Sequence, residues 1–133
     1  GRGMKLLVVD DDVIVIKSCR RILEAEDFEV FTCPGADEAL EKMKHYDFDL
    51  LLMDVKMPKH DGLFLMREIK KNWPDIPIIV MSGYPTPETI ADALKLGATQ
   101  FIPKPFRPDE LMKSIRLVLH KAGKKDSFPT GAG

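Results

Sequence analysis

Residues 6–12 read LLVVDDD, a run of four apolar side chains that ends in three aspartates. The same arrangement returns at residues 50–54, LLLMD, and at residues 78–82, IIVMS, where an apolar run ends in a polar residue. Short runs that are apolar throughout are typical of strands buried on both faces of a sheet. Two further runs complete a series of five predicted strands, which are Leu6–Val9, Glu29–Thr32, Leu50–Met53, Ile76–Met81 and Gln100–Ile102.

The segments between these runs carry apolar residues at helical spacing, so each is predicted to be a helix. The predicted buried stripe of the first helix consists of Val13, Ile16, Cys19 and Leu23. Strands that alternate with helices predict a parallel sheet, because parallel neighbours need crossover connections and these are usually helical and right-handed. The sequence therefore predicts an α/β fold in a single domain. Its five-stranded parallel sheet is doubly wound, with helices on both faces.

The composition is that of an ordinary globular domain, and it argues against several function classes. Of the 133 residues 44% are hydrophobic and 31% are charged, and the formal net charge of −1 gives no general attraction to nucleic acid or to an anionic membrane. The apolar runs are far shorter than the ~20 residues that span a bilayer, and we expect no secretory signal before Met4. Cys19 and Cys33 form no CxxC pair, so reduced thiols without metal and a cytoplasmic location are expected.

Polar side chains follow four of the five predicted strands. Three aspartates, residues 10–12, follow the first strand, Asp54 follows the third, Ser82 the fourth and Lys104 the fifth. Ligands of open parallel sheets bind outside the carboxyl ends of the strands, so these groups should meet at one edge. Clustered carboxylates repel unless a cation lies among them, and oxygen ligands alone suit Mg²⁺ better than zinc. Carboxylate, cation, lysine and hydroxyl are the parts that stabilise a phosphoryl group in transfer, with Asp54 as the best candidate nucleophile.

A set of five segments, in order and in spacing, resembles the receiver domain of two-component response regulators, the CheY-like superfamily. These segments are LVVDDD (7–12), LMDVKMP (52–58), DG (61–62), VMSG (80–83) and FIPKPF (101–106). The resemblance covers about residues 4–121. It implies a flavodoxin-like (βα)5 sandwich.

The resemblance also implies a role for each residue of the site. Asp54 is expected to be the phospho-acceptor, which takes a phosphoryl group from a histidine of a sensor kinase and also contributes to the Mg²⁺ site. Asp11 is expected to coordinate Mg²⁺ directly, Asp10 to help through water, and the backbone carbonyl of Lys56 to complete the protein ligands. Lys104 is expected to contact the bound phosphoryl group.

The switch implied by the resemblance lies on the fourth and fifth strands. Ser82 is expected to hydrogen-bond a phosphoryl oxygen, and Phe101 then to turn inward, which alters the face built from the fourth helix, fifth strand and fifth helix. The bond between Lys104 and Pro105 is expected to be cis. Lys56 and Tyr84 occupy positions that often tune the phosphoryl lifetime in the family, and the bulk of Tyr84 predicts a lifetime of minutes or more.

The resemblance further implies the partners and leaves some alternatives open. The expected partners are a sensor histidine kinase or phosphotransfer domain and an output domain or effector, with a possible phosphorylation-dependent homodimer and a link to transcription regulation. The chain is expected to be a signalling switch and not an enzyme, although it takes part in its own phosphorylation and autodephosphorylation. A haloacid-dehalogenase-like phosphohydrolase is disfavoured, because Lys56 stands where that family has a second aspartate. An interaction-only receiver is the other alternative.

The ends of the chain and one aspartate carry simpler interpretations. Residues 1–3 are interpreted as a cloning remnant, residues 4–121 as the receiver domain, and residues 122–133 as a tail or the start of a linker. Asp12 is left open between a metal-binding role and a cap of the first helix. The Asp61–Gly62 pair is interpreted as helix-capping geometry.

Overall fold

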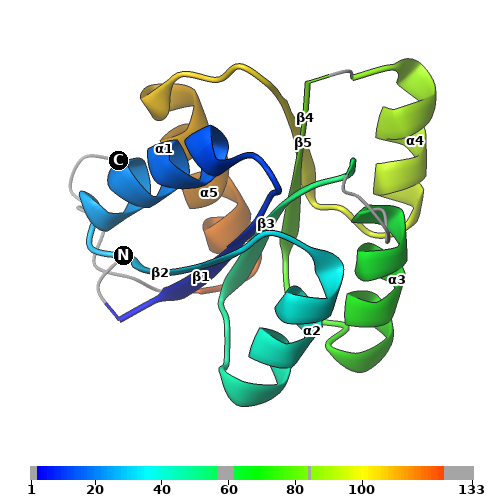
Figure 1. The fold of residues 1–133 in the computed structure, drawn as a ribbon, viewed down its shortest axis with the longest axis horizontal. Helices are drawn as coiled ribbons and strands as arrows, with labels where there is room; N and C mark the ends of the chain where they lie inside the picture. Colours follow the sequence, from blue (N-terminus) through cyan, green and yellow to red (C-terminus); the bar gives the residue numbers. More distant parts are fainter. Residues whose placement is uncertain (1–2, 57–61, 84, 125–133) are drawn as a thin grey trace.

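The computed structural model describes residues 3–56, 62–83 and 85–124. Strands and helices alternate strictly along the chain (Figure 1). In order the elements are β1 (Lys5–Val9), α1 (Val13–Glu24), β2 (Glu29–Cys33), α2 (Ala36–His45), β3 (Leu50–Asp54), α3 (Gly62–Asn72), β4 (Ile78–Ser82), α4 (Pro87–Lys95), β5 (Gln100–Pro103) and α5 (Pro108–Lys121). The interpretations placed on Tyr84, on Asp61 and on the outermost residues 1–2 and 125–133 lie outside the described residues.

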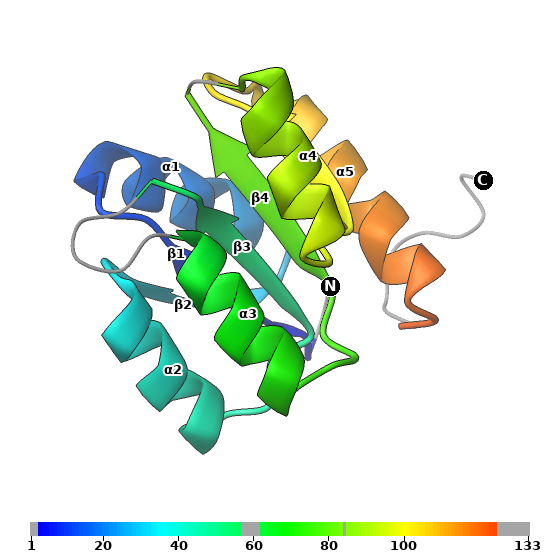
Figure 2. The same ribbon diagram turned by 90° about the vertical axis from the view of Figure 1, so that its right-hand side faces the viewer.

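The five strands form one parallel sheet in the order β2-β1-β3-β4-β5. Helices α1 and α5 cover one face of this sheet, and α2, α3 and α4 cover the other (Figures 1 and 2). The predicted doubly wound α/β fold is confirmed, and β3 is the central strand.

The core has two halves because side chains alternate across the strands. Leu7, Leu51 and Val80 point toward α2, α3 and α4, whereas Leu6 and Leu52 point toward α1 and α5. All five are fully buried. Burial on both faces explains why these strands are apolar throughout, since each such side chain gains roughly 1.5–3 kcal/mol by leaving water.

Two predicted details of the elements are wrong. The run that begins at Ile76 enters the sheet only at Ile78, because the Ile76 N–H donates to the Trp73 carbonyl in a turn (3.3 Å) and Pro77 has no N–H to donate. Val13 is 60% exposed and does not belong to a buried stripe. Helix α1 instead packs on the sheet through Val15, Cys19, Ile22 and Leu23. Ile16, also predicted for the buried stripe, is only partly buried and is not among the residues of this core half.

The helices begin where their sequences provide caps. Asp12 is the N-cap of α1 and accepts a hydrogen bond from the Ile14 N–H (2.9 Å), while Thr86 caps α4 by accepting from the Thr89 N–H (3.1 Å). Within the described ranges no helix combines the length and the hydropathy needed to cross a bilayer.

Candidate functional site

The two least exposed carboxylates among the described residues lie at the carboxyl edge of the sheet, on the neighbouring strands β1 and β3. β1 pairs in parallel with β3, with Val9 opposite Met53, so the residues that follow, Asp10 and Asp54, lie side by side. Asp10 is fully buried, and Asp54 is 8% exposed. Two acidic side chains so close together and so little hydrated need a positive partner.

Lys104 supplies that positive partner from the end of β5. Its Nζ donates to Asp10 Oδ2 at 2.6 Å and to Asp54 Oδ2 at 2.8 Å. The side chain of Lys104 is 16% exposed, so both ion pairs are largely shielded from water. The backbone of Lys104 is held as well, because its N–H donates to the Ser82 carbonyl at 2.7 Å. The peptide bond between Lys104 and Pro105 is cis.

The other oxygen of each carboxylate accepts a hydrogen bond from the backbone N–H of the second residue after it in the chain. Asp10 Oδ1 accepts from the Asp12 N–H and Asp54 Oδ1 from the Lys56 N–H, both at 2.9 Å. Each carboxylate thus accepts one hydrogen bond from the backbone and one from the Lys104 ammonium. A charged acceptor with two donors is strongly oriented.

Burial and charge act in opposite directions on the pKa values of this cluster. Burial raises the pKa of Asp10 above its ordinary 3.8, and the charge of Asp54 adds to this, against the hydrogen bonds from Lys104 and Asp12 and the charge of Lys104. For Lys104 burial lowers the pKa, but the hydrogen bonds to Asp10 and Asp54 and their charges together outweigh it, so its pKa lies above 10.5. The raised pKa of Lys104 follows from its two contacts with carboxylates, both under 3 Å.

Three carboxylates are close enough to hold one metal ion. Oxygen atoms of Asp10, Asp11 and Asp54 lie within 4.8 Å of one another, and Asp11 is exposed. All three offer hard oxygen ligands, and one side of the cluster is open to solvent through Asp11, which fits a cation that keeps several waters, as Mg²⁺ does. Of the two roles left open for Asp12, the structure shows the cap, because its carboxylate accepts a hydrogen bond from the Ile14 N–H at the start of α1.

The two residues predicted to form the switch lie on the strands beyond Asp54. Asp54 of β3 pairs with Met81 of β4, and Ser82 follows Met81 on that strand. Ser82 is 1% exposed. Phe101 lies on β5, opposite Val80 of β4. Its side chain is half-buried and packs against the core half under α2, α3 and α4. The sheet therefore brings Ser82 to the edge that carries Asp54 and places Phe101 one strand farther out.

Sequence analysis missed an apolar rim beside the carboxylates. Val13 and Ile14, in the first turn of α1, are 60% and 74% exposed. Ile14 lines a hollow together with Phe106, Pro105 and Lys104. A signal was present in the sequence, because residues 13–16 read VIVI and one helix face cannot bury four consecutive residues.

A second missed residue is Gly62, which sequence analysis treated as part of a cap. Gly62 is the first residue of α3 and is buried against the end of β3. Its N–H donates to the Val55 carbonyl at 2.7 Å. The available signal was a glycine at the start of a helix, which can mark a close approach of two backbones.

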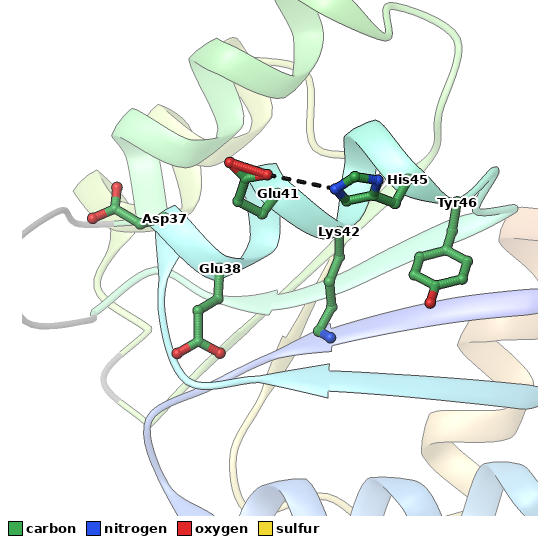
Figure 3. Close-up of a pocket in the computed structure, with 6 residues that line it drawn as sticks. All are labelled: Asp37, Glu38, Glu41, Lys42, His45 and Tyr46. Atoms are coloured by element: carbon green, nitrogen blue, oxygen red, sulfur yellow. Dashed lines mark ion pairs between the residues drawn. The ribbon is translucent and has the colours of Figure 1, made fainter.

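A hollow on α2 is separate from the carboxylate cluster. Figure 3 shows this hollow, where the side chains of Glu41 and His45 face each other at 3.8 Å; its lining does not include Asp10, Asp54 or Lys104. The His45 side chain is 72% exposed, as expected for a solvated histidine.

The two cysteines are also remote from one another. Cys19 lies in the core half under α1 and α5, and Cys33 lies in the other half, so the sheet separates them. Burial raises the pKa of each thiol to about 12, with negative charges nearby adding to it. Buried thiols of this kind are unreactive.

Comparison with known proteins places this geometry in a family. The profile of the response regulator receiver domain family matches residues 6–116. Among curated proteins, the cell cycle response regulator CtrA of Brucella ovis is 29% identical over 119 residues, which cover 90% of this chain and 51% of CtrA. The chain thus spans about half the length of the curated relatives it matches.

Solved structures agree with this match. A CheY-like receiver domain protein from Methanospirillum hungatei JF-1 is 33% identical with a TM-score of 0.87, covering 92% of this chain and 98% of that one. NtrX from Brucella abortus is 35% identical with a TM-score of 0.86, covering 90% of this chain and 27% of that one. The similarity includes both sequence and fold.

Proposed function

Because this chain belongs to the response regulator receiver domain family, we propose that Asp54 is its phospho-acceptor. Receiver domains are the signalling switches of two-component systems. In the proposed step an oxygen of Asp54 forms a bond to the phosphorus of a phosphohistidine, the N–P bond breaks, and its electron pair stays on the imidazole nitrogen. The product is an acyl phosphate on Asp54.

The contact between Lys104 and Asp54 is the observation that carries this proposal. The Lys104 Nζ lies 2.8 Å from Asp54 Oδ2, in a setting with little exposure to water. A cation at this distance can follow a phosphoryl oxygen once the group is attached, because the charge then moves outward from the carboxylate. Low hydration makes this electrostatic stabilisation stronger than it is in bulk water.

Magnesium is the proposed cofactor of the same site. Asp10, Asp11 and Asp54 are the proposed carboxylate ligands, with the backbone carbonyl of Lys56 as a further ligand. When bound, the ion would neutralise charge on the phosphoryl oxygens during transfer. The chain's own residues orient the acceptor: Lys104 and the Lys56 N–H hold the two oxygens of Asp54 in fixed directions.

The proposed switch begins at Ser82 and acts on the face formed by α4, β5 and α5. Ser82 is the last residue of β4 and its carbonyl already binds the backbone of Lys104, so a shift of Ser82 toward a phosphoryl oxygen would be felt at the end of β5. Phe101 then turns inward, and the altered face controls an output domain or partner. Ser82→Ala should weaken this change; an equally complete change in the variant would count against the role of Ser82.

A phosphodonor protein is proposed to dock on the apolar rim formed by Val13 and Ile14. Exposed apolar side chains next to a charged site are suited to a partner that must bring its phosphohistidine close to Asp54. This donor is a sensor histidine kinase or a phosphotransfer domain. Further elements of the proposal are a cytoplasmic location, a homodimer that depends on phosphorylation, and no direct contact with nucleic acid or membrane.

Intact mass after treatment with a small phosphodonor tests the central claim. The parent and Asp54→Asn are each treated with and without Mg²⁺. A gain of one phosphoryl group that needs both Mg²⁺ and Asp54 is the expected result. No gain under any condition would favour an interaction-only receiver, and a gain that survives in Asp54→Asn would mean that another residue is the nucleophile.

A further inference from the structure

Gly62 approaches the end of β3 more closely than any residue with a side chain could. A Cβ placed on Gly62 would lie 2.4 Å from the Val55 Cα and 2.5 Å from the Asp54 carbonyl oxygen. Both atoms belong to the backbone, so no rotation of a side chain can relieve the contact. An added methyl group must therefore displace the backbone at Asp54 and Val55.

Backbone conformation does not explain this glycine. The glycines with left-handed φ angles among the described residues are Gly3, Gly97 and Gly123. Gly62 instead is the first residue of α3, a position where its φ angle does not call for glycine. The close approach to β3 is the feature that requires the absence of a Cβ.

The contact reaches Asp54 through a single peptide group. The carbonyl of the Val55–Lys56 peptide accepts the Gly62 N–H at 2.7 Å, and the N–H of the same peptide donates to Asp54 Oδ1 at 2.9 Å. A peptide group is planar and rigid, so a rotation imposed at its carbonyl is transmitted to its N–H. Gly62 and the Asp54 carboxylate thus bind opposite sides of one plane.

We propose that Gly62 is a positioning residue, which sets the direction of the Asp54 carboxylate through the Val55–Lys56 peptide. This inference rests on the proposed function, in which Asp54 is the phospho-acceptor and a ligand of Mg²⁺. Gly62 lies against the backbone of Asp54 and has no side chain that could reach the carboxylate. Its effect on phosphorylation and on Mg²⁺ binding therefore passes through the backbone contact between α3 and β3.

Gly62→Ala is the variant that tests this role, and Gly35→Ala is its matched control. A Cβ on Gly35 meets no atom within 4 Å, so the control adds the same methyl group without a clash. Ile69→Val is a second control: Ile69 is fully buried on α3, and loss of one buried methyl group lowers stability away from the peptide that contacts Asp54.

Three quantities are measured for each protein at a temperature well below its unfolding transition. These are the Mg²⁺ dissociation constant by calorimetry, the maximal rate of phosphorylation at saturating Mg²⁺ and phosphodonor, and the donor concentration at half that rate. Gly62→Ala should bind Mg²⁺ roughly 10-fold more weakly, as expected when a group that orients a ligand is disturbed. Its maximal rate should fall roughly 10- to 100-fold, because displacement of a nucleophile by less than 1 Å has effects of this size.

The half-saturating donor concentration should change little, and both controls should match the parent in all three quantities. A folded Gly62→Ala that binds Mg²⁺ and is phosphorylated like the parent would overturn the inference, even if it melts at a lower temperature. A parent that is never phosphorylated would instead refute the proposed function, so the two failures are distinguishable.

A measurement on the parent protein covers the case in which Gly62→Ala does not fold. Selective ¹⁵N-glycine labelling gives an amide signal for Gly62, Gly35 and Gly97. On titration with Mg²⁺ the Gly62 signal should move with the same midpoint as the calorimetric binding, since its hydrogen bond to Val55 follows the peptide that holds Asp54. Gly35 and Gly97 should not move, and an unmoved Gly62 signal would overturn the inference.

Discussion

Replacement of Lys104 by methionine should destabilise the protein in the absence of divalent ions, and the structure sets the size of the effect. Lys104 is the cation in contact with Asp10 and Asp54, at 2.6 and 2.8 Å, and its side chain is only 16% exposed. Methionine keeps the length and removes the charge. Two carboxylates of low exposure then face each other without the cation that Lys104 provides. Loss of one partner from such a buried pair costs about 3–5 kcal/mol.

The pH dependence of this cost follows from the raised pKa of Lys104. The folded-state pKa lies above the ordinary 10.5, so the stabilisation by Lys104 is fully present below pH 10.5 and is lost as the pH rises through the folded-state value. The difference in unfolding free energy between parent and variant should therefore stay constant from neutral pH up to pH 10.5 and shrink above pH 10.5. Proton uptake by Asp10, whose pKa burial raises, limits the cost in acid.

Urea unfolding at pH 7, in chelator and in Mg²⁺, provides the assay. In chelator Lys104→Met should lose about 3–5 kcal/mol, which corresponds to a decrease in melting temperature of roughly 10–20 °C for a domain of this size. In Mg²⁺ the loss should be smaller, because an ion bound to the folded state replaces the missing positive charge. Lys124→Met is the control: it breaks the 3.3 Å pair with Asp49, in which both side chains are more than a quarter exposed, and should cost under about 1 kcal/mol.

Two results would refute this reasoning. A cost of Lys104→Met in chelator no larger than that of Lys124→Met would mean that the carboxylates do not depend on Lys104. An equal cost in chelator and in Mg²⁺ would mean that the ion and Lys104 do not neutralise the same charges.

Three further predictions address other parts of the chain. Cys19 and Cys33 should react with thiol reagents at pH 8 only as fast as the protein unfolds locally. The free energy of unfolding should also decline as the pH rises from 9.0 toward their folded-state pKa of about 12, and urea unfolding at several pH values across this range would measure the decline. Thr86→Ala should cost about 1 kcal/mol in urea unfolding by removing the cap on the Thr89 N–H, with no change if that cap is absent in solution. Tyr84→Ala should shorten the lifetime of the acyl phosphate, measured by intact mass over time, and hydrolysis no faster than in the parent would contradict the assigned steric role.

The fold was predictable because the sequence carries one signal for each layer. Strand β3 (Leu50–Asp54) is apolar at each position before Asp54, a pattern that a sheet exposed on one face would not allow. The start of β4 was predicted two residues early because Ile76 is apolar and buried, yet belongs to the turn before the strand. Val13 was misplaced because spacing alone does not show where a helix passes the rim of the sheet.

The site was predictable in its members but not in its contacts. The rule that strand ends share one edge was enough to group Asp10, Asp54 and Lys104, and the structure brings these three together. That Lys104 contacts Asp10 as closely as Asp54 depends on strand order and side-chain direction. Gly62 escaped prediction for a similar reason: its significance is a distance between two backbones, and a sequence contains no distances.

The order of the strands explains why a lysine, and not a shorter basic group, stands at position 104. In the sheet β5 lies two strands from β3 and three from β1, and neighbouring strands are about 4.8 Å apart. Asp54 at the end of β3 is therefore about 10 Å from the axis of β5, and Asp10 is farther still. The Lys104 backbone is anchored by the hydrogen bond from its N–H to the Ser82 carbonyl, and its four-carbon side chain reaches over β4 to both carboxylates. The same length lets the ammonium follow charge that moves outward from Asp54.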